Sequence, residues 1–165
     1  MGRLKPWIDG RAVLVRNSDA YLTGSLTELV EGWDGQRPRL LGRRGASAAD
    51  FGDIQYVGAC LLPADIVAGL AERPSGLYDL VWRPHWERGE IEFVMTTGEF
   101  VDCGTPRDYL RANLVASGGR SVIGAGARVL GSVVRTVVWP GGEVAADEVL
   151  HDCIRVGRDL TVDAR

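Results

Sequence analysis

The sequence predicts an α/β chain that begins with a sheet and ends in a tail of short β-strands. Three observations lead to this prediction. Two apolar runs, residues 11–16 and 55–62, have the composition of sheet strands, and each is followed by a helical pattern. The segment 98–114 is typical of a strand, a tight turn and a helix. After residue 117 the pattern changes to small apolar groups separated by glycine and polar residues.

The composition is that of an ordinary soluble chain. The 165 residues are 45% hydrophobic and 25% charged, with a net charge of −3 and no basic run, so we expect neither nucleic acid nor membrane as a partner. No apolar run approaches the ~20 residues that cross a bilayer, and the N-terminus lacks the apolar stretch of a signal peptide. Cys60, Cys103 and Cys153 are far apart, so no disulfide framework or zinc site is indicated. The expected compartment is the reducing cytoplasm.

The first half of the chain is expected to alternate strands and helices. Residues 2–9 fit the end of a helix, and the four apolar residues within 11–16 suit a strand buried on both faces of a parallel sheet. Residues 25–28 form a capping box, and the helix that follows has one apolar face, expected in the core: Leu26, Leu29, Val30 and Trp33. A short strand at 39–41 and a polar loop at 43–49 follow.

A second buried strand, 55–62, opens the next part of the sheet. Pro63 begins a helix that turns Ile66, Val67 and Leu70 inward, and a short helical pattern at 76–82 is cut by Pro84. Strands are expected at 91–95 and 99–102. The nearby residues Trp82, His85 and Trp86 have two interpretations, the lining of a sugar pocket or a small satellite core under a loop.

The segment 98–114 organises the chain around one carboxylate. Thr105 can cap the helix, Pro106 suits its first position, and Asp108 lies three residues beyond the cap. Asp102 is thereby placed at the carboxyl end of a strand, just before a helix N-terminus, where it can hold a metal ion while the amides of Gly104 and Thr105 face an anion. A well-capped strand-to-helix connection without further function is the alternative.

Asp19 has a similar position earlier in the chain. It follows the strand 11–16, and ligands of open α/β sheets collect at the carboxyl ends of strands. An aspartate that only forms a turn is equally common. Both interpretations remain open from the residues alone.

Residues 101–106 and 108–113, VDCGTP and DYLRAN, resemble the D-x-G-T-P-x-x-Y-L-x-A-N signature of sugar-phosphate nucleotidyltransferases. Mannose-1-phosphate guanylyltransferases and glucose-1-phosphate thymidylyltransferases belong to this family. The resemblance implies that Asp102 binds a catalytic Mg²⁺. Residues 15–20, VRNSDA, are similar to the family's V-x-N-A/G-D-x-W/Y segment, which implies that Asp19 is the second metal ligand. Both aspartates are therefore the expected catalytic residues.

The same resemblance implies a set of substrate-binding residues. Residues 55–63 are similar to a family segment, F/Y-x-G-x-x-x-x-x-P, whose glycine lies against the sugar, and this glycine is Gly58 here. Close packing also demands glycine at such positions. Asn17, Gly104 and Thr105 complete the expected set.

The implied reaction is attack by a sugar 1-phosphate oxygen on the α-phosphate of a nucleoside triphosphate, which releases pyrophosphate. The implied fold over residues 1–117 is the C-terminal part of a Rossmann-like nucleotidyltransferase sheet. The family's Gly-rich, Arg-containing nucleotide loop and its lysine segments have no counterpart in these residues. We therefore expect the chain alone to be truncated, inactive and poorly soluble because of an exposed sheet edge. The alternative is a non-catalytic partner or sugar-phosphate-binding subunit.

Residues 118–165 are expected to form a separate tail. Aliphatic residues recur at a step of six, which resembles the hexapeptide repeat of a left-handed parallel β-helix: Ile123, Val129, Val138, Val144 and Leu150. The step is interrupted near Arg135, so the tail is expected to have about two coils and to serve contacts between subunits. A hexapeptide-repeat acyltransferase with His151 as its base is a weaker alternative, because two coils are too few for an acyl-donor groove.

Overall fold

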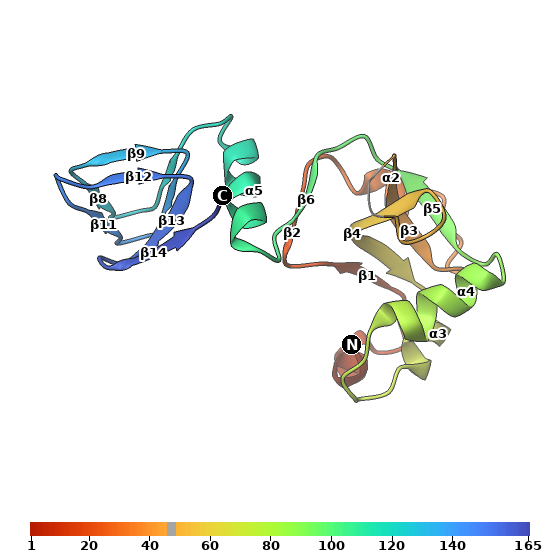
Figure 1. The fold of residues 1–165 in the computed structure, drawn as a ribbon. Coiled ribbons are helices and arrows are strands. Elements are labelled where there is room, and N and C mark those ends of the chain that lie inside the picture. The colour runs from red at the N-terminus through yellow and green to blue at the C-terminus, as the bar shows by residue number, and fades with distance from the viewer. Residues whose placement is uncertain (46–48) are drawn as a thin grey trace. The chain divides into compact units, whose positions relative to one another are not determined.

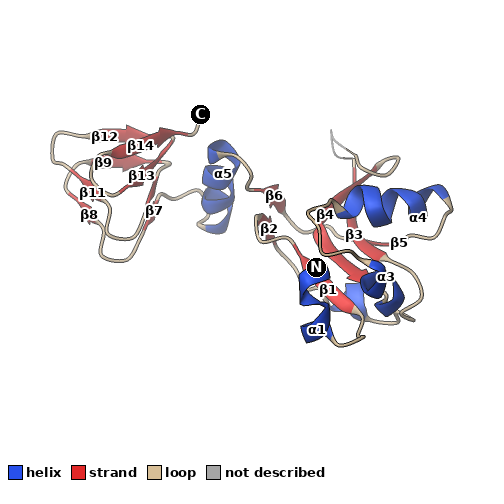
Figure 2. Ribbon diagram, turned by 90° about the horizontal axis from the view of Figure 1, so that it is seen from below, coloured by secondary structure: helices blue, strands red, loops and turns tan. Residues whose placement is uncertain are grey.

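The computed structural model describes residues 1–45 and 49–165. The chain divides into two compact units, Met1–Glu99 and Phe100–Arg165, and each is described by itself. Figure 1 labels the elements along the chain, and Figure 2 distinguishes its strands from its helices. Within the described residues, no helix is both long enough and apolar enough to cross a membrane.

The first unit is a four-stranded mixed sheet with short helices around it (Figure 1). The strands lie in the order β1-β4-β3-β5; β4 is antiparallel to β1 and to β3, and β3 is parallel to β5. Its elements are η1 (Gly2–Leu4), α1 (Lys5–Ile8), β1 (Val13–Arg16), β2 (Ala20–Leu22), α2 (Thr27–Val30), β3 (Arg39–Arg44), β4 (Ile54–Leu62), α3 (Ala64–Gly69), η2 (Tyr78–Trp82), α4 (Arg83–Glu87) and β5 (Glu92–Met95).

The predicted strand at 11–16 exists as β1, but the prediction of a parallel strand buried on both faces is wrong. Val13 pairs with Leu62 of β4 in antiparallel register, and β1 is the outermost strand in the order. Val13 and Val15 are half-buried, whereas Leu14 remains 44% exposed. One face of β1 is partly covered and the other is exposed, and a short apolar run does not distinguish this case from burial on both faces.

The predicted strand at 55–62 is confirmed as β4, the most buried strand of the unit. Its pairing with β3 shifts within the strand, since Leu40 faces Cys60 whereas Gly42 faces Tyr56. The extra residues of β4 therefore form a β-bulge around Gly58, whose φ of 82° lies in the left-handed region. The bulge turns this part of β4 toward the segment that follows β1.

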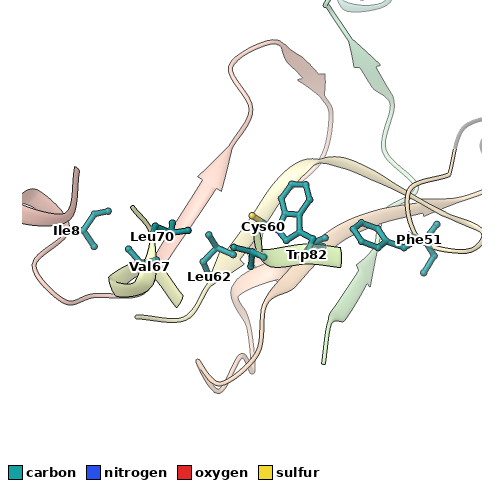
Figure 3. Close-up of a cluster of buried hydrophobic side chains, with 10 residues drawn as sticks. Ile8, Phe51, Cys60, Leu62, Val67, Leu70 and Trp82 are labelled. Atoms are coloured by element: carbon teal, nitrogen blue, oxygen red, sulfur yellow. The ribbon is translucent and has the colours of Figure 1, made fainter. Parts of the chain in front are cut away.

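Apolar side chains from helices and strands form one core in this unit. Figure 3 shows members of this core, including Phe51, Cys60, Leu62 and Trp82. The predicted helix after residue 25 is confirmed but short: α2 ends at Val30, which is 50% exposed, and only Leu29 of the predicted apolar face is buried. The predicted capping box at 25–28 is wrong, because Leu26 is the N-cap of α2 and has no side-chain cap, while the Ser25 hydroxyl accepts a hydrogen bond from the Thr27 amide.

Two local predictions differ from the structure. Pro84 does not end a helix, because it lies in the first turn of α4, directly after the π-helical turn η2. Arg43 and Arg44 belong to β3 and not to a loop, and residues 46–48 of the predicted loop lie outside the described residues.

The second unit consists of one strand, one helix and a series of short strands. Three sets of strands pair in parallel, β7-β10-β13, β8-β11 and β9-β12, and β14 is antiparallel to β13. The elements are β6 (Phe100–Asp102), α5 (Pro106–Ala116), β7 (Val122–Ile123), β8 (Arg128–Val129), β9 (Ser132–Val134), β10 (Val137–Val138), β11 (Glu143–Val144), β12 (Val149–His151), β13 (Cys153–Val156) and β14 (Leu160–Asp163).

The parallel pairs repeat at regular separations along the chain. Paired residues are 15 apart between β7 and β10 and between β8 and β11, and 17 apart between β10 and β13 and between β9 and β12. Val138, Val144 and Leu150 from the predicted six-residue step are buried together with Cys153. Ile123 is 45% exposed, so its expected inward position is wrong.

The helix α5 packs on the short strands of its own unit, beside β13 and β14 (Figure 1). Leu110 and Leu114 of α5 share a core cluster with Val137, Ile154 and Ala164. The boundary between the two compact units lies just before β6. The change in sequence pattern had indicated a boundary at residue 117.

Candidate functional site

The connection between β6 and α5 has the predicted cap. The Thr105 hydroxyl accepts a hydrogen bond from the Asp108 amide at 3.1 Å and donates one to the Asp108 carboxylate at 2.6 Å. Pro106 occupies the first turn, where its missing N–H leaves no donor unsatisfied. Because both roles of the Thr105 hydroxyl are filled, this side chain fixes the start of α5.

Asp102 is the last residue of β6, and its side chain is exposed. Its Oδ1 accepts a hydrogen bond from the Gly104 amide at 3.2 Å. The predicted anion-facing amide of Gly104 is therefore directed at the carboxylate of Asp102 in this structure. The contact orients one carboxylate oxygen and leaves the group at the surface, at the start of a helix.

The segment after β1 forms a tight turn that carries the second carboxylate. Asn17 and Asp19 are both exposed, and β2 begins directly after Asp19. The Asn17 amide donates a hydrogen bond of 2.8 Å to the Gly58 carbonyl, which ties the turn to the bulge of β4. The two predicted substrate-binding residues Asn17 and Gly58 are thus neighbours.

Gly58 is required here by close packing. A Cβ atom at this position would lie 2.9 Å from the Cβ of Ala20 and 3.4 Å from the Cβ of Asn17. The left-handed backbone adds a second reason, since side chains other than glycine strain it. The structure accounts for Gly58 through the turn that covers it, and a contact with a sugar stays a prediction.

Asp19 belongs to the first unit and Asp102 to the second, so each carboxylate is described separately. Among the described residues, no group of three or more histidine, cysteine, aspartate or glutamate side chains could hold a metal ion. A magnesium ion needs fewer protein ligands than this, because it keeps several waters and is commonly held by one or two carboxylates and the phosphates of a substrate. Each of the two exposed carboxylates, taken by itself, is a hard oxygen donor of the kind that Mg²⁺ prefers.

The aromatic residues near Trp82 have a packing role. The Phe51 ring contacts Trp82 and Trp86 at centroid distances of 6.4 and 5.6 Å, and Trp82 also lies 4.5 Å from the Tyr56 ring. Burial raises the pKa of the Cys60 thiol, next to Tyr56, to about 11, so this cysteine is not a nucleophile at neutral pH. These contacts favour the satellite-core interpretation over a sugar pocket.

One polar cluster in the second unit was not predicted as a site. Arg135 donates from Nε to Oδ1 of Asp152 at 2.7 Å, and His151 Nδ1 lies 2.7 Å from Oδ2 of the same carboxylate. These two hydrogen bonds hold the pKa of Asp152 below its usual value, and the bond from Arg135 has the larger effect. Arg135 and Asp152 both have left-handed backbones, at φ 47° and 49°. In the sequence, the six-residue step is interrupted at Arg135, and His151 was expected only as the base of the acyltransferase alternative. Neither signal indicated that both residues meet at Asp152.

No protein-family model matches the chain, and no curated protein matches it by sequence. Solved structures of sugar-phosphate nucleotidyltransferases match its fold, which confirms the resemblance noted in the sequence at the level of the fold. A glucose-1-phosphate thymidylyltransferase from Bacillus anthracis, solved with sucrose, aligns over 70% of this chain and 58% of its own, with 16% identity and a TM-score of 0.59. At such identity the similarity shows the fold.

Two further structures extend this comparison. A UTP-bound UDP-glucose pyrophosphorylase from Acinetobacter baumannii aligns over 68% of this chain and 53% of its own, with 16% identity and a TM-score of 0.55. A mannose-1-phosphate geranyltransferase from Thermus thermophilus aligns over 99% of this chain and 69% of its own, with 15% identity and a TM-score of 0.55. The chain thus spans little more than half the length of the first two structures.

Proposed function

We propose that this chain carries the metal-binding and sugar-phosphate-binding part of a sugar-1-phosphate nucleotidyltransferase. The observation that carries the proposal is Asp102, an exposed carboxylate at the end of β6, oriented by the Gly104 amide and followed by the capped helix α5. This arrangement matches the signature segment in a chain whose fold is similar to solved nucleotidyltransferases. Asp19 is proposed as the second ligand, from its position in the turn between β1 and β2.

In the proposed reaction, an oxygen of a sugar 1-phosphate attacks the α-phosphate of a nucleoside triphosphate, and pyrophosphate leaves. A Mg²⁺ ion bound there would neutralise the charge that develops on the phosphates. Asp19 and Asp102 would supply its protein ligands, and Gly58 would act through the turn that covers it, by placing Asn17 beside the sugar. No protein nucleophile is needed, because the attacking group is the phosphate of the substrate itself.

The nucleotide side of the reaction is proposed to lie outside these 165 residues. No Gly-rich loop precedes a helix in the sequence, and the chain spans 58% of the Bacillus anthracis structure. Backbone amides of such loops hold triphosphates in other nucleotide-binding proteins. The chain is therefore proposed to bind a sugar phosphate and metal, and to turn over only together with a triphosphate-binding segment or partner.

Calorimetric titration of the chain with glucose 1-phosphate and mannose 1-phosphate tests this proposal. We expect saturable binding that requires Mg²⁺ and weakens more than about tenfold in the Asp102→Asn variant, since metal-site contacts are commonly worth 10–100-fold in affinity. Asp147→Asn, an exposed aspartate in the same unit, is the matched control and should bind as the parent does. Equal, metal-independent binding by all three proteins would overturn the proposal.

Pyrophosphate release provides the second test. The chain alone, supplied with Mg²⁺, a sugar 1-phosphate and each nucleoside triphosphate in turn, should release none above background. Pyrophosphate release by the chain alone would contradict the assignment of the nucleotide site to another segment. It would leave the metal assignment to be tested in the Asp19→Asn and Asp102→Asn variants.

We also propose that the short strands after α5 form a small parallel β-helix. The support is the register, in which paired residues of the three parallel sets are separated by 15 or 17 residues. We propose that a second copy of the chain binds the outer surface of these short strands, where Val149 is 73% exposed and Leu130 is 57% exposed. Sedimentation of the Val149→Lys variant tests this, and a monomeric parent chain would overturn it.

A further inference from the structure

A cleft of about 650 Å³ lies within the second unit, between α5 and the corners of the short strands. One wall is α5 and the glycine pair that ends it, Gly118 and Gly119. The opposite wall contains Arg135, Asp152 and the segment 164–165. This volume lies within the range of about 300–1,000 Å³ that is typical of small-molecule sites.

The lining of the cleft is strongly basic. Its lining residues include four arginines, Arg107, Arg111, Arg135 and Arg165, and one acidic residue, Asp152. That carboxylate is bound to Arg135, and Arg165 lies 3.6 Å from Asp163. Within the part of the chain that the structure describes, no ion pair is found for Arg107 or Arg111. Two guanidinium groups are therefore available to an anion from outside.

The positions of these two arginines are unfavourable for the helix itself. Arg107 lies in the first turn of α5, where the helix dipole favours negative charge. Arg111 is four residues further on, so two like charges are neighbours on one face, which destabilises a helix slightly. Residues whose charge or local preference opposes the structure around them are expected mainly at functional sites. An anionic ligand between the two would remove both conflicts.

Part of the cleft lining is apolar. Leu110, Leu114 and Ala164 line it while belonging to the core of the unit, and Val115 adds a half-exposed apolar side chain. A bare inorganic anion leaves this surface without a partner. A ligand with a charged phosphate and a flat organic group would occupy both the arginine wall and the apolar wall.

We propose that this cleft is a binding site for a small organic phosphate of the nucleoside monophosphate class, with its phosphate between Arg107 and Arg111. Guanidinium groups recognise phosphate through paired charge-assisted hydrogen bonds. Asp102 does not line the cleft, so the proposal does not rest on the metal and sugar-phosphate function proposed above.

Titration of the whole chain with uridine 5′-monophosphate at fixed low salt, without divalent metal, tests this site. We expect one saturable site, and binding weaker by about tenfold in each of the Arg107→Gln and Arg111→Gln variants, since hydrogen bonds to charged groups are the stronger kind. Arg128→Gln removes the same charge from an exposed position in the same unit, outside the cleft, and should bind as the parent does. Uridine, which lacks the phosphate, should not bind.

A second measurement separates ligand binding from a structural role of the arginines. Thermal unfolding should show Arg107→Gln at least as stable as the parent, because the substitution removes a charge that the helix dipole disfavours. Asp102→Asn should keep full affinity for uridine 5′-monophosphate, so a failure of the metal proposal leaves this result unchanged. The proposal would be overturned if Arg128→Gln weakened uridine 5′-monophosphate binding as much as the cleft variants do. Binding that does not saturate, or an equal affinity for inorganic phosphate, would overturn it as well.

Discussion

The two compact units build their cores from different side chains. In the first unit, large rings converge on Phe51, with centroid distances of 5.8 Å to Tyr78, 5.6 Å to Trp86 and 5.4 Å to Phe93. In the second unit, valine, leucine and cysteine recur along paired strands, and one arginine, Arg155, is buried with an exposed fraction of 4%.

This difference decides how each unit responds to substitution. The first core depends on a few residues that touch several partners far away in sequence. The second repeats small contacts between neighbouring strands, so each apolar residue contributes less, and the ion pair of its buried arginine makes its stability depend on pH. Substitutions in the two units should therefore differ in their cost.

Phe51→Ala is expected to cause the largest loss. Phe51 is fully buried and contacts four aromatic rings, so its removal leaves a cavity that costs about 3–5 kcal/mol in the free energy of unfolding. Urea unfolding checks this value. Trp7→Ala is the control, because the Trp7 side chain is 74% exposed and its loss should have little effect. Equal destabilisation by both variants would contradict the aromatic core.

Gly58→Ala is expected to cost about 2 kcal/mol. The new Cβ would lie 2.9 Å from Ala20, and the left-handed backbone penalises any side chain by about 1–2 kcal/mol. Gly10→Ala is a matched control, since Gly10 is also left-handed, at φ 70°, but has no atom within 4 Å of the new Cβ. The difference between the two variants in urea unfolding measures the close approach of the turn, and no difference would exclude it.

Thr105→Ala is expected to cost about 1 kcal/mol, because the start of α5 loses its cap. Thr105→Ser keeps the hydroxyl and should recover most of the loss. Hydrogen exchange of the α5 amides is the measurement, because it reports the second unit separately from the first. Full protection in the Thr105→Ala variant would show that packing of Leu110 and Leu114 alone defines the helix.

Glu148 gives the second unit a predicted dependence on pH. The buried Arg155 side chain hydrogen-bonds the Glu148 carboxylate and thereby holds its pKa below the usual value. A lowered folded-state pKa stabilises the fold fully above the unfolded value of about 4.3, and this contribution is lost as the pH falls through the folded-state pKa. Glu148→Gln should therefore lose less stability than the parent chain as the pH falls below about 4.3.

The control for the pH series is Asp147→Asn, the exposed neighbour of Glu148. Its acid unfolding curve, followed through amides of the second unit, should match that of the parent chain. The same steep acid dependence in Glu148→Gln would mean that the Arg155 contact does not control the stability of this unit.

The sequence predicted the parts of the fold that local signals determine. The cap at Thr105, the buried strand β4 and the inward Val67 of α3 follow from capping chemistry and periodicity, which act within a few residues. The partners of β1 and the exposure of Val30 depend on contacts with distant segments. No pattern inside a short segment contains that information.

The candidate site was predictable to the same extent. Asp102 and Gly58 could be singled out because their flanking residues form recognisable segments, and their roles stay predictions, whereas the basic cleft was missed. Its arginines come from α5, from a corner after β9 and from the end of the chain, and they are adjacent only in the folded unit. The conflict of Arg107 with the helix dipole was visible in the sequence and is the signal that could have indicated the cleft.

The binding of Mn²⁺, a paramagnetic substitute for Mg²⁺, tests whether Asp19 and Asp102 hold one metal ion. Titration in the presence of glucose 1-phosphate would compare the parent chain with Asp19→Asn, Asp102→Asn and the double variant. If both carboxylates hold one metal ion, each single variant loses more than about tenfold in affinity, and the double variant loses much less than the product of the two. Unchanged Mn²⁺ affinity in the Asp102→Asn variant would contradict the account.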